Sequence, residues 1–203
     1  MVGLEQEGIG IQYLDLGGGV GITYDDEQPP HPVDYAAAIR AELGDVDCTL
    51  ILEPGRVITG NAGILVTEVQ YTKVNSGGEK VKRFIIADAA MNDLARPSLY
   101  GAYHEILPVQ EPAEDAAKHQ VDVVGPICET GDFMAKDRMM PDVQPGELLA
   151  VMSCGAYGFS MASTYNSRPK VAEILVDGDQ FRVIRERENY EDLVRGEDLS
   201  TLP

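Results

Sequence analysis

The chain has 203 residues, a formal net charge of −18 and an ordinary apolar fraction of 44%. Its length allows one large domain or two smaller ones. Acidic residues outnumber basic ones 34 to 16, which argues against a nucleic-acid partner, because such proteins need clustered Lys and Arg to displace counterions from phosphates. No apolar run approaches the roughly 18 residues of a membrane span, and residues 1–10 lack the basic segment of a signal peptide. We therefore expect a cytoplasmic protein.

The first part of the chain predicts a strand–helix–strand unit. An apolar run over Ile11–Leu16 stops at a triple glycine, and Val33–Leu43 has helical spacing and ends at a glycine. A second short apolar run, Thr49–Leu52, is again followed by a loop rich in special residues. This βαβ order is typical of a parallel sheet or barrel. A complete (β/α)8 barrel needs roughly 250 residues, so we expect residues 1–60 to be the closing part of something larger.

After about residue 61 the pattern changes to short strands separated by turn signals. A hairpin turn is indicated by Asn75–Gly78, and a second by Asp177–Asp179. Such spacing predicts an antiparallel β-domain over residues 61–203. The strands we expect are Gly63–Lys73, Lys82–Asp88, Val121–Val124, Leu148–Met152, Val171–Val176 and Phe181–Arg185.

The cysteines and histidines favour neither a disulfide framework nor a metal centre. The cysteines are odd in number, lie far apart and form no CxxC pair (Cys48, Cys128, Cys154). That pattern is typical of free thiols in a reducing compartment. The histidines are equally scattered (His31, His104, His119), so we expect no bound metal.

Two loops at consecutive strand ends indicate a cofactor site. Gly17, Gly18 and Gly19 allow backbone N–H groups to approach an anion, although a tight βα turn explains them equally well. The second loop, Glu53-Pro54-Gly55-Arg56, places a carboxylate and a guanidinium on the same rim, where active sites of parallel sheets form. The alternative to a functional role for this loop is a surface ion pair beside a Pro-Gly turn.

Further motifs make the pattern specific. The sequence contains, in order, Leu14–Gly19, Glu53–Arg56, Asp93–Tyr100, Cys128–Asp132, Gly155–Gly158 and Tyr165–Pro169. Together these motifs resemble the fold-type III pyridoxal-phosphate (PLP) decarboxylases, and the diaminopimelate decarboxylases among them, over essentially the whole chain. The resemblance implies that residues 1–60 are the end of an alanine-racemase-like (β/α)8 barrel and residues 61–203 an antiparallel β-barrel domain.

The resemblance also implies a role for individual residues. The triple glycine is similar to the family's phosphate loop, Glu53 to the partner of the pyridine nitrogen, and Gly55 and Arg56 to contacts with phosphate and substrate. Cys128 is similar to an active-site cysteine that the second subunit of a homodimer delivers, and Glu129 to a substrate contact. Tyr157 is similar to a contact of both cofactor and substrate.

The chemistry of these residue types agrees with those roles. A carboxylate such as Glu53 keeps a nearby ring nitrogen protonated, which PLP needs in order to store electrons. A thiol such as Cys128 suits protonation of the carbanion left after carbon dioxide departs. The alternative for Cys128 is a buried structural thiol, which is what we expect of Cys48 and Cys154. For Tyr157, which lies near glycines, the alternative is a turn aromatic.

The substrate implied by the resemblance is meso-2,6-diaminopimelate, which would yield L-lysine and carbon dioxide. Its distal end carries a carboxylate as well as an ammonium group. Arg96 and Tyr100, four residues apart, offer a guanidinium and a hydroxyl to that carboxylate, and Glu129 offers an acid to the ammonium. The alternative for Arg96 is a surface arginine at a helix start.

The family's Schiff-base lysine lies on barrel strands that precede this sequence, and none of the lysines present matches its position (Lys73, Lys80, Lys82, Lys118, Lys136, Lys170). Because the chemistry needs a lysine amine aimed at the aldehyde, we expect the 203-residue chain to be inactive by itself. Two other hypotheses stay open. The chain is a non-catalytic homologue that regulates a full-length partner, or it derives from a relative acting on ornithine, arginine or carboxynorspermidine.

Overall fold

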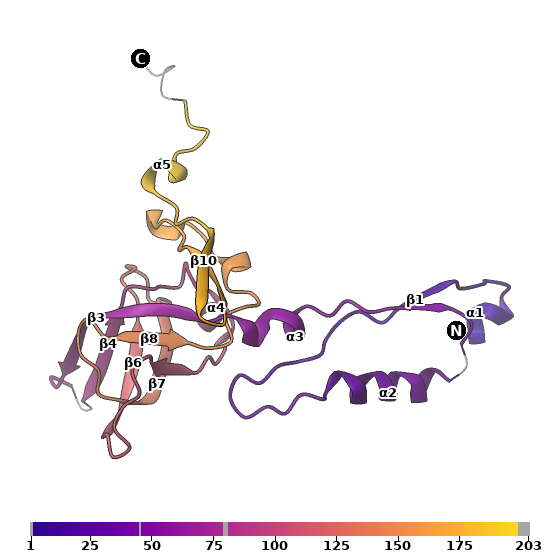
Figure 1. Ribbon diagram of the computed structural model, residues 1–203, viewed down its shortest axis with the longest axis horizontal. Coiled ribbons are helices and arrows are strands. Elements are labelled where there is room, and N and C mark those ends of the chain that lie inside the picture. The colour runs from indigo at the N-terminus through magenta and orange to yellow at the C-terminus, as the bar shows by residue number, and fades with distance from the viewer. Residues whose placement is uncertain (1, 45, 79–80, 199–203) are drawn as a thin grey trace.

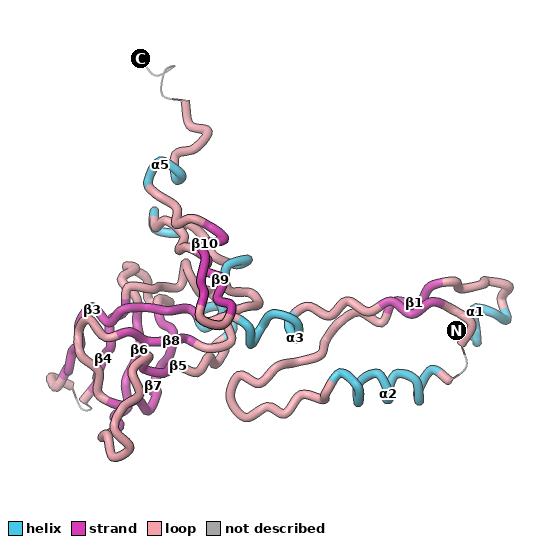
Figure 2. The backbone as a smooth tube through the Cα atoms, viewed as in Figure 1, coloured by secondary structure: helices cyan, strands magenta, loops and turns pink. Residues whose placement is uncertain are grey.

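The computed structural model describes residues 2–44, 46–78 and 81–198. Three parts follow one another along the chain (Figures 1 and 2): an N-terminal arm (residues 2–62), a β-domain (63–172) and a C-terminal projection (173–198). The arm extends away from the β-domain, and the C-terminal end projects from it in another direction (Figure 1).

The arm contains the predicted strand–helix–strand unit. Its elements are α1 (Val2–Gln6), β1 (Tyr13–Asp15), α2 (Pro32–Leu43), β2 (Thr49–Ile51), α3 (Arg56–Thr59) and the 3₁₀ turn η1 (Gly60–Ala62). Strands β1 and β2 pair in parallel, with Tyr13 opposite Thr49. The parallel βαβ arrangement is therefore confirmed.

Helix α2 is determined by local signals. Its first turn carries Pro32, the Val33 N–H donates to the His31 imidazole at 3.3 Å, and Gly44 ends the helix with a φ of +61°. No residue of α2 is buried. The helix is thus specified by its caps but has little to pack against among the described residues.

The β-domain is built on a six-stranded, barrel-like mixed sheet with the order β5-β8-β3-β4-β6-β7. Its strands are β3 (Leu65–Asn75), β4 (Lys82–Ala87), β5 (Ile106–Pro108), β6 (Lys118–Val124), β7 (Phe133–Pro141) and β8 (Leu148–Val151). All neighbouring pairs are antiparallel except β4 and β6, which are parallel. The β-domain expected from the sequence is confirmed, with this one parallel pairing added. A short helix, α4 (Arg96–Tyr100), lies between β4 and β5.

Strands β5 and β7 were not predicted. The middle of β7 is Lys136-Asp137-Arg138, which breaks the apolar alternation, and Asp137 has a φ of +52° where the β6–β7 register shifts. A bulge of this kind changes which face successive side chains take. A strict alternation of apolar and polar residues, which would indicate a strand, is therefore absent from the sequence of β7.

One hydrophobic core lies inside the β-domain and includes side chains from all six strands. Its members are Val69, Ile85, Ala89, Leu94, Ile106, Val121, Val123, Met134, Ala135, Met140, Val143, Leu149 and Val151. The C-terminal part contains the 3₁₀ turns η2 (Phe159–Met161) and η3 (Tyr165–Ser167), then β9 (Glu173–Asp177), β10 (Gln180–Arg185) and α5 (Tyr190–Leu193). Strands β9 and β10 form the predicted hairpin, with Gly178 at a φ of +60° in its turn.

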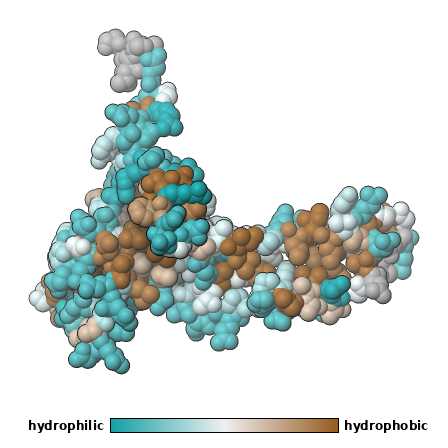
Figure 3. Space-filling model, viewed as in Figure 1, coloured by the Kyte–Doolittle hydropathy of each residue, from teal (hydrophilic) through white to brown (hydrophobic). Residues whose placement is uncertain are grey.

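The molecule exposes 13981 Å², whereas a compact monomer of this mass exposes about 9,300 Å². The arm exposes apolar side chains, visible as brown patches in Figure 3, and Tyr13, Leu50, Ile51, Leu52 and Ile58 are among the exposed ones. Within the described ranges, no helix is both long and apolar enough to cross a lipid bilayer.

Candidate functional site

The two loops predicted to form a site lie against each other. Because β1 and β2 are parallel, their carboxyl ends share one edge. The Glu53 N–H donates to the Gly17 carbonyl at 2.8 Å, and a Cβ on Gly18 would overlap the Glu53 carbonyl. Glycine at position 18 is thus required for this approach of the two loops.

The glycine loop presents free backbone donors. The Gly17 N–H donates to the Asp15 carboxylate at 2.8 Å, whereas the N–H groups of Gly18, Gly19 and Val20 make no hydrogen bond among the described residues. Gly17 and Gly19 have φ values of +68° and +101°, and a Cβ on either would meet nothing within 4 Å. Adjacent free amides in such a loop form an anion-binding concavity. The loop therefore fits a phosphate group.

Tyr157 joins this site from the β-domain. A Cβ built on Gly55 would lie 3.9 Å from the Tyr157 hydroxyl, and the Arg56 guanidinium lies 5.2 Å from the centre of the Tyr157 ring. Tyr157 itself has a φ of +61°, a conformation that costs energy for a residue with a side chain and that is enriched at functional sites. The residues predicted to contact the cofactor are thus brought together.

Tyr24 connects this group to Arg96. The Arg56 guanidinium lies 5.6 Å and the Arg96 guanidinium 4.6 Å from the centre of the Tyr24 ring. Both arginines are within the range of a cation–π interaction. Arg96 is only 7% exposed, so its alternative as a surface arginine is wrong.

His104 is buried behind Arg96. Its Nε2 lies 2.8 Å from Arg96 Nη1, its Nδ1 lies 2.8 Å from the Met152 carbonyl oxygen, and the Tyr24 ring packs edge-on against it. Burial, with a further contribution from the charges of Arg96 and Arg138, lowers the pKa of His104 below its usual value of 6.5. The imidazole is therefore neutral in the folded protein at pH 7.

Cys128 and Glu129 lie in a second group, on the loop between β6 and β7. Cys128 is exposed and free. The Glu129 carboxylate accepts hydrogen bonds from the Gly131 N–H at 3.2 Å and from the Tyr165 hydroxyl at 3.3 Å. The negative charge of Glu129 raises the pKa of Tyr165.

Asp132 holds the Cys128 loop in place. Its carboxylate accepts the Ile127 N–H at 2.6 Å and the Met91 N–H at 2.8 Å. Burial raises its pKa, and the two hydrogen bonds oppose that shift. The loop that presents Cys128 is therefore tied to the segment just before α4.

The two groups remain separate within one chain. Among the described residues, no hydrogen bond, ion pair or ring contact joins Cys128 or Glu129 to the glycine loop or to Arg56. Tyr100 is 67% exposed at the end of α4, while Arg96 is buried at its start. The pair predicted to receive one carboxylate is thus divided between the inside and the surface.

The other thiols differ from Cys128. Burial raises the pKa of Cys154 to about 12, and Cys48 is half-buried. The raised pKa keeps the Cys154 thiol protonated and therefore unreactive, which agrees with the structural role expected for it.

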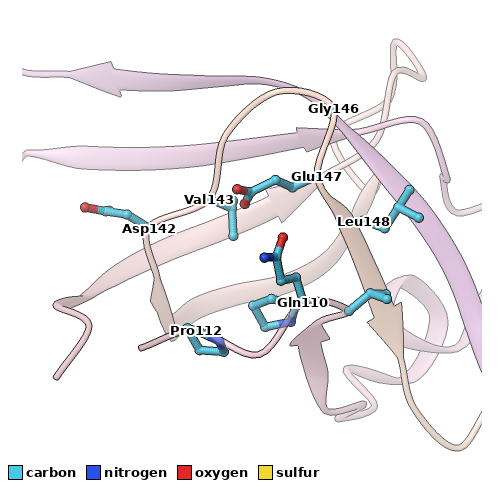
Figure 4. Close-up of a pocket in the computed structure, with 9 residues that line it drawn as sticks. Gln110, Pro112, Asp142, Val143, Gly146, Glu147 and Leu148 are labelled. Carbon is cyan, nitrogen blue, oxygen red and sulfur yellow. The ribbon is translucent and has the colours of Figure 1, made fainter. Parts of the chain in front are cut away.

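A pocket of about 470 Å³ lies elsewhere on the β-domain (Figure 4). It is lined by Pro108, Val109, Gln110, Pro112, Asp142, Val143, Gly146, Glu147 and Leu148. None of these residues belongs to the predicted site, and Figure 4 shows that the labelled ones come from neighbouring strands and loops of the β-domain. The pocket therefore has no part in the arrangement described above.

Sequence reasoning missed Tyr24 and His104. Tyr24 follows the glycine loop by five positions and His104 follows Arg96 by eight, and neither spacing marks a contact. The scattered positions of the histidines bear only on metal binding. A buried guanidinium needs a hydrogen-bond acceptor. If Arg96 is taken as buried, the need for such an acceptor is the signal that points to His104.

The chain is similar in sequence and fold to known proteins. A family model described as the C-terminal sheet domain of pyridoxal-dependent decarboxylases matches residues 22–155. A diaminopimelate decarboxylase of Aquifex aeolicus is 53% identical over 192 residues, which cover 94% of this chain and 44% of the relative. The corresponding enzyme of Pseudomonas aeruginosa is 53% identical over 196 residues, covering 97% of this chain and 46% of the relative.

A solved structure shows the same fold. The crystal structure of Helicobacter pylori diaminopimelate decarboxylase complexed with L-lysine superimposes with a TM-score of 0.85 and 46% identity, covering 96% of this chain and 46% of that one. The chain thus spans about half the length of the relatives that it matches. Since the family model covers more than half of its residues, the chain belongs to the pyridoxal-dependent decarboxylases, of which it contains the C-terminal sheet domain.

Proposed function

We propose that the complete protein decarboxylates meso-2,6-diaminopimelate to L-lysine and carbon dioxide, as a cytoplasmic homodimer that uses pyridoxal 5′-phosphate. The observation that carries this proposal is the convergence of the glycine loop, the Glu53–Arg56 loop and Tyr157 at one place. The relatives that are 53% identical to this chain are named diaminopimelate decarboxylases, and this supports diaminopimelate as the substrate.

The cofactor, when bound, supplies an electron sink for the pair released as the bond to the departing carboxylate breaks. The free N–H groups of Gly18 and Gly19 bind its phosphate, and Gly55 and Arg56 close the other side. Glu53 holds a proton at the ring nitrogen. Tyr157 packs beside Arg56 and restricts where cofactor and substrate sit.

The remaining residues bind substrate and move a proton. Although Arg96 is buried and Tyr100 is exposed in a single chain, they lie one helical turn apart on α4, and we propose that both receive the distal carboxylate while Glu129 receives the distal ammonium. Cys128 donates a proton to the carbon that carbon dioxide has left. Because Cys128 lies apart from the glycine loop within one chain, we propose that it acts on the site of a second copy.

A chimera tests this function. The part of the Aquifex aeolicus enzyme that this chain does not match is fused to the chain, and carbon dioxide release is measured with PLP. We expect turnover of meso-diaminopimelate, and a loss of at least about 100-fold for Cys128→Ala, in keeping with the usual contribution of a positioned proton donor. Cys48→Ala is the matched control and is expected to keep activity. Turnover of ornithine or arginine in place of diaminopimelate would overturn the assignment.

The 203-residue chain tested by itself gives a complementary result. Lys82 pairs with Asp122 at 2.6 Å and Lys170 with Glu188 at 2.9 Å, both in or beside the β-domain. We therefore expect no lysine of this chain to be trapped as a covalent adduct by borohydride in the presence of PLP, as judged by mass spectrometry. A specific adduct on one lysine, accompanied by carbon dioxide release, would contradict this expectation.

A further inference from the structure

The hydrogen bonds of His104 determine where its proton resides. A guanidinium has only donors, so the Arg96 Nη1–H donates to Nε2 of the ring at 2.8 Å. A backbone carbonyl accepts only, so the ring donates from Nδ1 to the Met152 oxygen at 2.8 Å. Both contacts are satisfied by one state, the neutral imidazole with its proton on Nδ1. A protonated ring would set an N–H against the N–H of Arg96.

The surroundings of the ring favour that state. His104 is 0% exposed. The groups that face it are Arg96, Arg138, the Tyr24 ring and the Cys154 thiol, which lies 3.9 Å from Nδ1. The Arg138 Nη1–H donates to the His104 carbonyl at 2.8 Å. Two cations and no carboxylate thus surround the imidazole among these contacts, and they disfavour a third positive charge.

Arg96 is left with one edge for a ligand. Its Nη1 is taken by His104. Its other guanidinium nitrogens make no hydrogen bond among the described residues. They are not enclosed either, since the Tyr24 hydroxyl is the enclosed side-chain atom that lacks a partner among those residues. That edge is therefore partly exposed, and the guanidinium carbon lies 4.6 Å from the centre of the Tyr24 ring.

The Arg56 guanidinium also lies over the Tyr24 ring, 5.6 Å from its centre. One aromatic ring thus sets the position of two guanidinium groups that come from α3 and α4. The Tyr24 hydroxyl is itself enclosed and has no hydrogen-bond partner among the described residues. A buried hydroxyl without a partner is costly, so a ligand or water that binds beside this ring would satisfy it.

We propose that His104 is a positioning residue for substrate recognition: as a neutral imidazole it takes one N–H of Arg96 and, with the Tyr24 ring, holds the free edge of that guanidinium toward the distal carboxylate of an amino-acid substrate. The identity of the carboxylate rests on the proposed function. The fixed orientation of Arg96 does not, because its contacts are made within this chain.

Nitrogen NMR of the 203-residue chain tests the positioning directly. Long-range ¹H–¹⁵N correlation is expected to show His104 with a protonated Nδ1 and a bare Nε2 at pH 6.5, the ordinary histidine value, where a free imidazole is half protonated. The Arg96 Nη signals are expected to be resolved, because the bond to His104 slows rotation of the guanidinium. A proton on Nε2, or titration near pH 6.5, would overturn the proposal.

Two substitutions separate the two hydrogen bonds of the ring. The Oε1 of glutamine in His104→Gln replaces the Nε2 acceptor for Arg96, whereas the Nδ2 of asparagine in His104→Asn replaces the Nδ1 donor to Met152. In the chimera, His104→Asn is expected to raise KM for diaminopimelate by about tenfold or more, with kcat changed less than about twofold, because one charge-assisted hydrogen bond is lost. His104→Gln is expected to stay within about threefold of the unmodified chimera.

The outcomes distinguish this proposal from the proposed function. An inactive chimera, or one that prefers another amino acid, contradicts the function, while the NMR result on the chain still decides the role of His104. An active chimera in which both variants have equal KM values contradicts the positioning role. Circular dichroism and thermal unfolding establish that each variant is folded, and restored slow rotation of Arg96 in His104→Gln is a readout that does not depend on activity.

Discussion

Asp132 shows at the residue scale how a buried carboxylate shapes the loop that carries Cys128. It accepts two backbone N–H groups, those of Met91 and Ile127. In Asp132→Ala both amides lose their acceptor, and we expect the free energy of unfolding in urea to fall by about 2 to 4 kcal/mol, since each unsatisfied buried donor costs about 1–3 kcal/mol. Asp142→Ala is the control. The Asp142 side chain is 65% exposed, so a change below about 0.5 kcal/mol is expected there.

His104 predicts a pH dependence of stability. Its pKa is lowered on folding, so between that lowered value and 6.5 the unfolded chain binds a proton that the folded chain does not. Stability is therefore expected to fall as the pH drops below about 6.5, by at most about 1.4 kcal/mol per pH unit. Urea midpoints between about pH 7.5 and pH 5.5 measure this slope.

The His104→Gln variant provides the comparison, because glutamine does not titrate and the slope is expected to become flatter. Asp93 and Asp132 act in the opposite direction at lower pH, since burial raises the pKa of each and stability rises as they take up protons toward 3.8. A slope unchanged by His104→Gln would show that other groups set it.

At the scale of elements, the end of the arm meets the β-domain beside two glycines, Gly63 and Gly155. The Cys154 N–H donates to the Gly63 carbonyl at 2.7 Å and the Gly155 N–H to the Gly60 carbonyl at 3.0 Å. A Cβ on Gly155 would overlap the Thr59 carbonyl, and a Cβ on Gly63 would lie 2.6 Å from the Gly155 Cα. The backbones that place Arg56 beside Tyr157 are thus in contact because neither position carries a side chain.

Gly155→Ala is accordingly expected to lower the melting temperature by at least about 2 °C, because forcing an atom into a packed contact costs about 1–3 kcal/mol or more and each kcal/mol shifts a chain of this size by about 2–4 °C. Gly77→Ala is the matched control. Its Cβ would find its nearest atom, the Asn75 Oδ1, at 3.7 Å. Differential scanning calorimetry of both variants gives the answer, and equal melting temperatures would contradict the account of this contact.

At the scale of the molecule, the arm is the part with least packing. A two-stranded sheet is marginal by itself, and α2 buries no residue. We expect brief trypsin digestion to cut first after Arg40 in α2 and after Arg195 near the C-terminus, both exposed, well before Arg83 or Arg138 in the β-domain. Mass spectrometry identifies the fragments. Equal rates of cleavage in the arm and the sheet would show that the arm is as stable as the β-domain.

Much of the fold followed from local patterns. The turn at Asp177–Asp179, the caps of α2 and the βαβ order of the arm all have signatures within a few residues, and all were found. Strand β7 was missed because a bulge interrupts its alternation around Asp137. Strand β5, Ile106–Pro108, is too short for a period to show.

The sequence by itself determined the family and the order of the motifs, because glycine loops and the Glu53–Arg56 segment carry their chemistry in residue type and spacing. Only the tertiary structure decided how Arg96 is held. Tyr24, Arg96 and His104 come from separate segments and meet because the part of the arm around Tyr24 lies against the β-domain. The partners of a buried charge depend on distances in space and on desolvation. Neither quantity can be obtained from the spacing of residues along a chain.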